Sequence, residues 1–248
     1  MSRVIVITGA GRGIGAATAV LAARVGFDVC VNYRSDAAAA HTIVAEIERT
    51  GRRAVAIQAD VGSESDVVRL FDAADRQLGR LTALVNNAGI LETQMRLESM
   101  PADRLERIFR TNVVGSLLCA REAVKRMSVR HGGSGGAIVN VSSAAARLGS
   151  PDEYVDYAAS KGAIDTFTIG LAREVGAEGI RVNAVRPGLI HTDMHALGGE
   201  PGRVERLRAS VPLRRGGTSD EVARSILWLL SDEAAYVNGA IVDVTGGR

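Results

Sequence analysis

The chain has 248 residues, of which 46% are hydrophobic, so it is long enough to bury a full core as one domain. Its net charge of +2 is small and evenly spread, which excludes nucleic acid as the main partner. The two cysteines, Cys30 and Cys119, stand apart in apolar segments and exclude a disulfide framework. No metal-ligand spacing, signal peptide or membrane-length apolar run is found, which predicts a cytoplasmic protein without a metal site.

The N-terminal segment has the pattern of an anion-binding turn. Val4–Ile7 reads as a buried strand, Thr8-Gly-Ala-Gly-Arg-Gly-Ile-Gly15 as a glycine-rich turn, and the alanine-rich stretch to about Val25 as a helix. Glycines let the backbone approach a pyrophosphate, and the helix N-terminus presents free N–H groups with partial positive charge. The G-x-x-x-G-x-G spacing after a first strand therefore predicts a dinucleotide site.

The end of the second predicted strand, Asp28–Tyr33, indicates which dinucleotide is bound. At this place a carboxylate holds the ribose 2′-hydroxyl of NAD, whereas an arginine accommodates the 2′-phosphate of NADP. The sequence offers Asn32-Tyr33-Arg34, with no acid, and Arg12 lies in the glycine-rich turn. Two arginines without an acid favour NADP(H); the alternative is that Arg34 is a solvated turn residue.

The rest of the chain alternates helices and strands. Further strands are predicted at 53–58, 82–85, 137–141, 180–185 and 240–244. Further helices are predicted at 37–50, after Ser63, from 101 to about 130, around Tyr157 and Lys161 up to residue 175, and at 219–230. Seven strands alternating with about six helices imply a single-domain, Rossmann-like, doubly wound parallel sheet. Residues 191–217 are irregular and rich in Gly, Pro and Arg, which predicts a substrate lid or a disordered loop.

Tyr157-Ala-Ala-Ser-Lys161 is the stretch most suggestive of catalysis. Residues four apart on a helix lie on the same face, so a phenol and an ammonium group would be neighbours. A nearby positive charge favours the phenolate, so we expect Lys161 to lower the pKa of Tyr157 from about 10 toward neutrality. Such a tyrosine could act as a general acid or base. A chance pairing is the alternative; the chain's only other lysine, Lys125, makes chance less plausible.

These features occur together in one family. The chain resembles the short-chain dehydrogenase/reductases, of the small type that includes 3-oxoacyl-carrier-protein reductases and glucose dehydrogenases. The resemblance covers nearly all residues and rests on an ordered set: Thr8–Gly15, Asp60, Asn86–Gly89, Asn112, Ser143, Tyr157, Lys161 and Pro187–Gly188. It implies a seven-stranded sheet in the order 3-2-1-4-5-6-7, with the site at the carboxyl ends of the strands.

The resemblance also implies roles for individual residues. Ser143 would stabilise the substrate oxygen, Tyr157 exchange its proton, Lys161 assist Tyr157 and hold the ribose, and Asn112 anchor a water that links Lys161 to solvent. Asn112 could instead be a satisfied structural amide. Cofactor contacts are implied for Gly9, Arg12, Gly13, Ile14, Gly15, Tyr33, Arg34, Asp60, Val61, Asn86, Ala88, Gly89, Tyr157, Lys161, Pro187, Gly188, Ile190 and Thr192.

Some features depart from the family pattern. The serine is doubled, and Ser143 is chosen over Ser142; the interval from Ser143 to Tyr157 is about one residue longer than the resemblance implies. Tyr154 is interpreted as a loop aromatic near the substrate mouth. Arg186, before Pro187, has no physical explanation in the sequence.

The sequence leaves open whether the protein is catalytic and which substrate and partners it has. The leading hypothesis is an NADP(H)-dependent enzyme that interconverts a carbonyl and a secondary alcohol; the alternative is a non-catalytic NADPH-binding regulator or scaffold. An acyl-carrier-protein partner would need a basic patch, which Arg203, Arg206, Arg208, Arg214 and Arg215 could supply, whereas a sugar would favour His191, Asp193 and His195. The resemblance implies a homotetramer (or a homodimer) formed through two long helices and the last strand.

Overall fold

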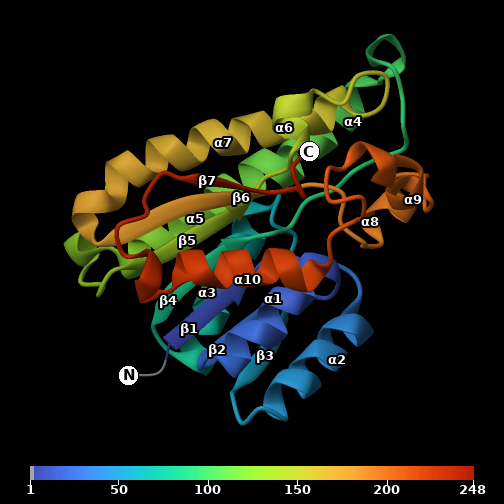
Figure 1. The fold of residues 1–248 in the computed structure, drawn as a ribbon. Coiled ribbons are helices and arrows are strands. Elements are labelled where there is room, and N and C mark those ends of the chain that lie inside the picture. The colour runs from blue at the N-terminus through green and yellow to red at the C-terminus, as the bar shows by residue number, and fades with distance from the viewer. Residues whose placement is uncertain (1–2) are drawn as a thin grey trace.

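A seven-stranded parallel sheet covered by helices on both faces forms the body of the molecule (Figure 1). The computed structural model describes residues 3–248. Its strand order, β3-β2-β1-β4-β5-β6-β7, confirms the order expected from the sequence. The order reverses between β1 and β4, so the loops that follow these two strands diverge and leave a crevice at the carboxyl edge of the sheet.

The strands are apolar along most of their length because both faces of the sheet are covered. Central β1 has four consecutive buried residues and pairs in parallel with both β2 and β4. The strands are β1 (Arg3–Ile7), β2 (Phe27–Tyr33), β3 (Ala54–Gln58), β4 (Leu81–Asn86), β5 (Gly136–Val141), β6 (Ile180–Pro187) and β7 (Ile241–Val244).

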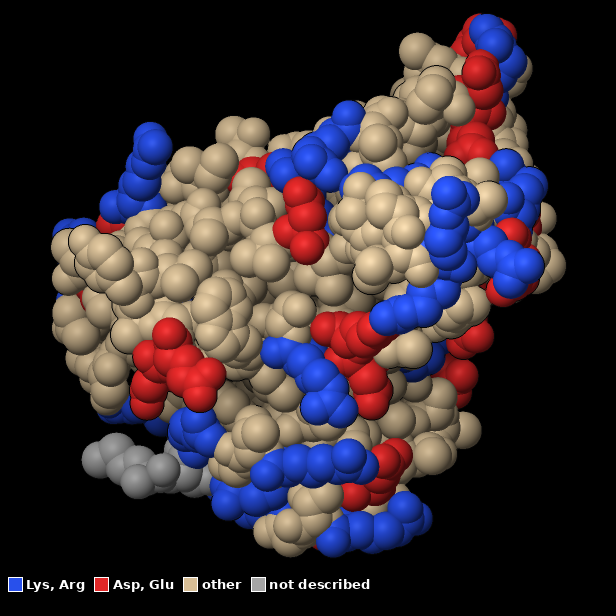
Figure 2. Space-filling model, viewed as in Figure 1, with Lys and Arg blue, Asp and Glu red and all other residues tan. Residues whose placement is uncertain are grey.

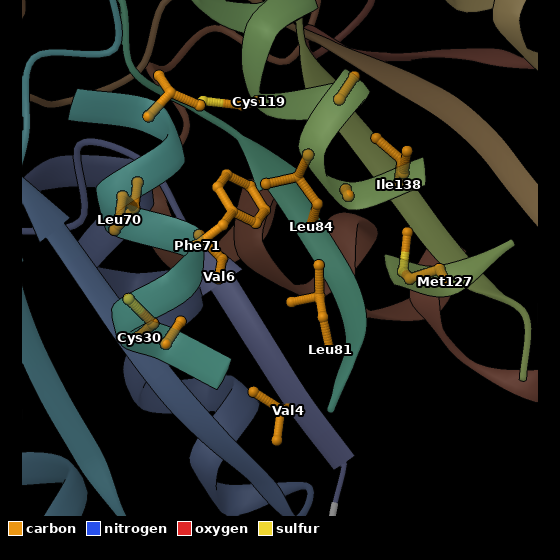
Figure 3. Close-up of a cluster of buried hydrophobic side chains, with 14 of the residues drawn as sticks. Val4, Val6, Cys30, Leu70, Phe71, Leu81, Leu84, Cys119, Met127 and Ile138 are labelled. Carbon is orange, nitrogen blue, oxygen red and sulfur yellow. The ribbon is translucent and has the colours of Figure 1, made fainter. Parts of the chain in front are cut away.

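Two hydrophobic cores lie on opposite faces of the sheet. One is formed against α1 (Gly13–Arg24), α2 (Ala37–Glu48) and α10 (Ser219–Leu230). The other is formed against α3 (Glu64–Leu78), α5 (Gly115–Met127) and α7 (Val155–Val175), and Figure 3 shows Phe71 at its centre. Cys30 and Cys119 are buried free thiols in this second core, and burial raises the pKa of Cys119 to about 12.

The segment from residue 101 to about 130 is not one helix, as the sequence pattern predicted. It consists of α4 (Ala102–Phe109), one π-helical turn (Arg110–Val114) and α5, followed by a 3₁₀ turn at Val129–His131. The π turn contains Asn112, whose buried amide bonds outside its own helix. Single π turns within α-helices are frequent at functional sites, which draws attention to Asn112.

The 191–217 segment is also more ordered than predicted. It contains α8 (Met194–Leu197), α9 (Arg203–Leu207) and a 3₁₀ turn at Arg208–Ser210. Tyr154 donates a hydrogen bond to the carbonyl of Gly198 at 3.2 Å, and Gln94 donates to Glu200 at 2.6 Å. The segment is therefore fastened to the loops before α4 and α7. The remaining short helices are α6 (Ala145–Leu148) and 3₁₀ turns at Leu97–Ser99, Gly176–Glu178 and Asp232–Ala234.

Charges of both signs are interspersed over much of the surface in Figure 2, with a mostly uncharged stretch over β7 and the adjoining part of α7. No helix within residues 3–248 is long and apolar enough to cross a membrane.

Candidate active site

Two adjoining cavities open at the carboxyl edge of the sheet. The glycine-turn cavity lies at the start of α1, and the Tyr157 cavity lies between the ends of β5 and β6 and the 191–217 segment. Ile14, Asn87 and Thr192 line both of them, so the two cavities form one continuous crevice. The Tyr157 cavity has a volume of about 440 Å³, which lies in the range of small-molecule pockets.

The glycine-rich turn is held in place by amide side chains. Asn32 accepts a hydrogen bond from the N–H of Gly9 at 3.1 Å, and Asn87 donates to the carbonyl of Thr8 at 2.8 Å. Gly9 has a φ of +61°, and a Cβ there would lie 3.0 Å from Cα of Ala88. Glycine is required at this position by conformation and by space, because the turn passes directly over the loop after β4.

Most of the predicted dinucleotide contacts line the glycine-turn cavity. Arg12 and Arg34 are exposed at its wall, and within residues 3–248 neither guanidinium has an ion-pair partner. The other predicted residues on this wall are Gly9, Gly13, Ile14, Tyr33, Asp60, Val61, Ala88, Gly89 and Thr192. Asp36, which the sequence analysis missed, lines it too; its carboxylate caps α2 by accepting from the N–H of Ala39 at 2.9 Å.

Asn86 and Gly15 do not line either cavity, contrary to expectation. Asn86 is the last residue of β4, and its buried amide donates to the carbonyl of Ser116 and to Asn140, both at 3.0 Å. Successive strand residues point to opposite faces, so Asn86 points into the core and its neighbour Asn87 lines both cavities. At Gly15, a Cβ would lie 2.5 Å from Nδ2 of Asn87, so its role is close packing.

Ser143, Tyr157 and Lys161 come together in the Tyr157 cavity. Nζ of Lys161 lies 5.6 Å from the Tyr157 ring centroid and donates to the carbonyl of Val141 at 2.7 Å. The Ser143 side chain lies close enough to the Tyr157 phenol to lower its pKa, and its Oγ accepts the N–H of Ala145 at 3.1 Å. Ser142 is buried beneath, with its hydroxyl donating to the carbonyl of Lys161, whereas Ser143 is only half-buried. Predicted residues Pro187, Gly188 and Ile190 line the same cavity.

The electrostatics of this pair differ from the expectation. Burial raises the pKa of Tyr157 to about 12, and the hydrogen bond from Ser143 opposes this only in part. Burial also lowers the pKa of Lys161 to about 8, against the field of Asp165. The prediction that Lys161 moves the Tyr157 pKa toward neutrality was therefore wrong for this structure, because loss of hydration is the largest cause of the shift and Lys161 is not among its causes.

Asn112 ties the π turn to the floor of the crevice. Its Oδ1 accepts from the N–H of Ile90 at 2.8 Å, and its Nδ2 donates to the carbonyl of Ile90 and to Ser160, both at 3.1 Å. A Cβ built on Gly89 would lie 3.4 Å from Asn112 Oδ1 and 3.5 Å from Lys161 Nζ. Both polar groups thus border the same small space beside Gly89, and Asn112 Oδ1 accepts one hydrogen bond within residues 3–248 and keeps a second lone pair.

A buried ion pair that the sequence analysis missed precedes Tyr157. Nε of Arg104 on α4 lies 2.7 Å from Oδ2 of Asp156, and the two side chains are 3% and 0% exposed. Oδ1 of Asp156 accepts the backbone N–H of Tyr157 at 2.8 Å. The pair therefore fixes the first turn of α7 against α4. No pattern in the sequence joins residues 52 apart, so only the fold reveals this contact.

The structure explains Arg186, which the sequence left without an account. Its Nε and Nη2 donate to one oxygen of Asp165, at 3.0 and 2.8 Å, while Asp165 Oδ1 is buried without a partner. Asp165 lies one helical turn after Lys161 on α7, so Tyr157, Lys161 and Asp165 share a helix face. The field of Asp165 raises the pKa of Lys161.

Four of the five arginines of the 191–217 segment are ion-paired, so they do not form a free basic patch; Arg214 donates to the carbonyl of Ala209 at 2.7 Å. Arg203 and Arg206 both pair with Glu153 and Glu200, Arg208 with Glu205, and Arg215 with Glu221. These bonds hold the pKa of Glu200 at about 2. Tyr154 lines the Tyr157 cavity as predicted for a residue near the substrate mouth, with the Arg203 guanidinium 5.1 Å from its ring centroid.

The crevice suits a nicotinamide dinucleotide. It combines a helix N-terminus with no acidic residue in its first turn, glycines that allow close approach and two unpaired arginines beside the cavity. The second cavity adds a hydroxyl, a phenol and an amine within contact distance of a bound small molecule. A doubly wound sheet with this site defines a nucleotide-dependent oxidoreductase.

Comparison with known proteins gives the same class. The family described as enoyl-(acyl carrier protein) reductase matches residues 9–248. The uncharacterized oxidoreductase YgfF of Escherichia coli is 57% identical over 98% of each chain, and a 3-oxoacyl-[acyl-carrier-protein] reductase of Synechocystis is 37% identical over 99% of this chain and 96% of its own. A short-chain dehydrogenase from Burkholderia cenocepacia, solved with NADP, superposes with a TM-score of 0.91 at 34% identity, covering 100% of this chain and 98% of the other.

The chain belongs to the short-chain dehydrogenase/reductases. It is accordingly an oxidoreductase of this family, with the fold of its solved relatives.

Proposed function

We propose that the protein is an NADP(H)-dependent oxidoreductase that interconverts a carbonyl and a secondary alcohol, with Tyr157 as the general acid or base. The observation that carries this proposal is the placement of Ser143, Tyr157 and Lys161 in one small-molecule cavity that adjoins the glycine-turn cavity. When bound, NADP(H) supplies or accepts the hydride.

The side chains of the Tyr157 cavity divide the remaining work. The Ser143 hydroxyl donates to the substrate oxygen and stabilises the charge that develops there. Tyr157 donates its proton to that oxygen in reduction. Burial raises the pKa of Tyr157 to about 12, so the phenol holds its proton at neutral pH and can donate it. Lys161 holds the ribose of the cofactor. Asn112 fixes the loop at Ile90, which borders the cofactor cavity.

Arg12 and Arg34 are proposed to bind the 2′-phosphate of NADP(H). Arg34→Ala should raise the KM for NADPH by roughly 10-fold or more, since a charge-assisted hydrogen bond is lost, and should leave the KM for NADH almost unchanged. Arg12→Ala should act in the same direction. Steady-state kinetics with both cofactors measures this, and an equal loss with NADH would refute the assignment.

The field of Asp165 is expected to set the alkaline limit of activity. Lys161 is charged below its pKa of about 8 and loses its charge as the pH rises through that value. Asp165→Asn removes a group that raises this pKa, so the alkaline limb of kcat should move to lower pH, by on the order of one unit. The plateau near pH 6 should persist, because Lys161 is charged there in both proteins. An unmoved limb would contradict this role.

The alternative function is a non-catalytic NADPH-binding regulator or scaffold. The cofactor absorbance change with NADPH, measured on a panel of ketones, 3-oxoacyl thioesters and sugars, separates the two. Tyr157-dependent consumption of NADPH on any member supports the enzyme. Binding of NADPH with silence across the panel favours the regulator. The paired arginines of the 191–217 segment give an acyl-carrier partner no support.

We also propose that the 191–217 segment is the substrate lid and that the protein forms a homotetramer. Exposed apolar side chains on the outer helices support assembly: Phe109 on α4, Leu117 on α5 and Ile169 on α7 are 38%, 40% and 37% exposed. Gly162 and Gly170 on α7 have open space at the Cβ position, which permits close helix packing. Light scattering would measure the assembly.

A further inference from the structure

The Tyr157 cavity has a charged wall that the proposed chemistry does not use. Its charged side chains are those of Lys161, Arg203 and Arg248, all basic, and of one acid, Glu153. Lys161 belongs to the proposed catalytic group. The other three lie at the side of the cavity formed by the 191–217 segment and the last residue of the chain, so their charges bear on whatever part of the substrate lies away from the reacting carbonyl.

Of the two arginines on this wall, Arg248 is the one without an anionic partner within residues 3–248. Arg203 pairs with Glu153 and with Glu200, the latter at 3.0 Å, and Arg206 pairs with the same two carboxylates from outside the cavity. Arg147 donates to the Arg248 carbonyl oxygen at 3.1 Å, which engages the main chain of that residue and not its side chain. Within residues 3–248, the Arg248 guanidinium has no ion pair and no hydrogen-bond acceptor.

The position of Arg248 makes an unpaired charge costly. Figure 1 places the end of the chain beside α6, and Leu148 of α6 and Leu207 of α9 line the same cavity as Arg248. Burial and the nearby Arg203 lower the pKa of the Arg248 guanidinium, while Glu153 opposes this. A half-buried cation next to other cations, against apolar side chains, is stabilised when an anion approaches it.

His195 adds an unused polar group to this wall. Its ring lines the cavity, and Nδ1 is buried without a hydrogen-bond partner. The pKa of His195 is lowered, mainly by burial and to a smaller extent by the nearby charge of Arg203. The ring is therefore neutral at pH 7 and repels neither a cation nor an anion.

We propose that the substrate carries an anionic group, a carboxylate or a phosphate, bound by Arg248 at the side of the Tyr157 cavity away from the glycine-turn cavity. Arg248 lines only the Tyr157 cavity, whereas Arg12 and Arg34 line only the glycine-turn cavity, so the two arginine sites serve different ligands. The proposal rests on the proposed function, because it places the anion on the molecule whose carbonyl meets Ser143 and Tyr157.

Binding to a variant that does not turn over tests the proposal separately from catalysis. We would measure, by calorimetry on the NADPH complex of Tyr157→Phe, the affinities of 3-oxobutanoate, 4-oxopentanoate and 5-oxohexanoate against their methyl esters. Dihydroxyacetone phosphate against dihydroxyacetone forms the phosphate arm. At least one charged compound should bind roughly 10- to 100-fold more tightly than its neutral partner, and the arm in which this occurs identifies the anion.

Arg248→Met in the same background should abolish that preference and leave the neutral compounds unaffected. Arg208→Met is the matched control. Arg208 lies at an exposed position of the 191–217 segment, outside both cavities, and its substitution should keep the preference. The proposal is overturned if no charged compound binds better than its neutral partner, or if Arg248→Met weakens both equally. Preferential binding of an anion without turnover in the wild type would uphold this inference while removing the proposed function.

Discussion

Tyr157→Phe is expected to lower kcat by about 10³- to 10⁴-fold while NADPH binding stays within a few-fold of wild type. The substitution removes only the phenol oxygen, and a positioned acid contributes about 10²- to 10⁴-fold to a proton transfer. The upper part of that range is expected because the Tyr157 hydroxyl is the proposed proton donor in the cavity. The ring, and with it the packing of α7, is retained. Single-turnover absorbance and NADPH fluorescence titration measure the two quantities.

Tyr154→Phe is the matched control for this substitution. Tyr154 lines the same cavity and is 3% exposed. Its hydroxyl donates to the carbonyl of Gly198 in the 191–217 segment, away from Ser143 and Lys161. Loss of the Tyr154 hydroxyl should weaken the attachment of the 191–217 segment, and the variant should retain most of the wild-type kcat. Turnover retained in Tyr157→Phe, or an equal loss in both variants, would show that Tyr157 is not the proton donor.

Arg104→Met is expected to destabilise the protein by about 3–5 kcal/mol, the largest stability effect that the site offers. The substitution leaves Asp156 fully buried without its counter-ion, and removing one partner of a buried pair exposes the full cost of the remaining charge. Because Asp156 also accepts the N–H of Tyr157, the start of α7 should loosen. Urea unfolding measures the free energy of unfolding, and kcat should fall with it at temperatures where the fold persists.

Two further variants separate the charge from the packing. Arg107→Met lies on the same helix, where its guanidinium is exposed and pairs with Glu92 and Asp103; it should hardly change stability. The double variant Arg104→Met with Asp156→Asn removes both charges and should recover a large part of the loss. If the double variant were as unstable as the sum of its parts, burial of an unpaired charge would not be the cause.

The parallel sheet and the location of the site followed from local patterns, whereas the strand order was implied by the family resemblance. Short β-branched runs alternating with helices imply a parallel sheet, and the glycine-rich turn after β1 marks its ligand-binding edge. The spacing of four residues between Tyr157 and Lys161 sufficed to place both on one helix face. The residue that lines the crevice depends on a single position: Asn87 lines both cavities, whereas the side chain of Asn86, the residue expected from the resemblance, points into the core.

Long-range contacts were decided only by the tertiary structure. The pairs Arg104–Asp156 and Arg186–Asp165 join residues 52 and 21 apart, and no periodicity links them. The π turn at Asn112 reads as ordinary helix in the sequence, because its bonds to Ile90 and Ser160 come from other elements. The arginines of the 191–217 segment looked like a basic patch until the fold brought Glu153 and Glu200 to them.

The pKa values show the same division. The sequence determined that a phenol and an amine are neighbours, because that follows from the geometry of a helix. Whether Tyr157 is acidic or basic depends on how much water the fold excludes, and burial raises its pKa to about 12 while it lowers that of Lys161 to about 8. All the elements that cover the site together exclude water from it, so these pKa shifts depend on the whole folded chain and cannot be assigned to one segment.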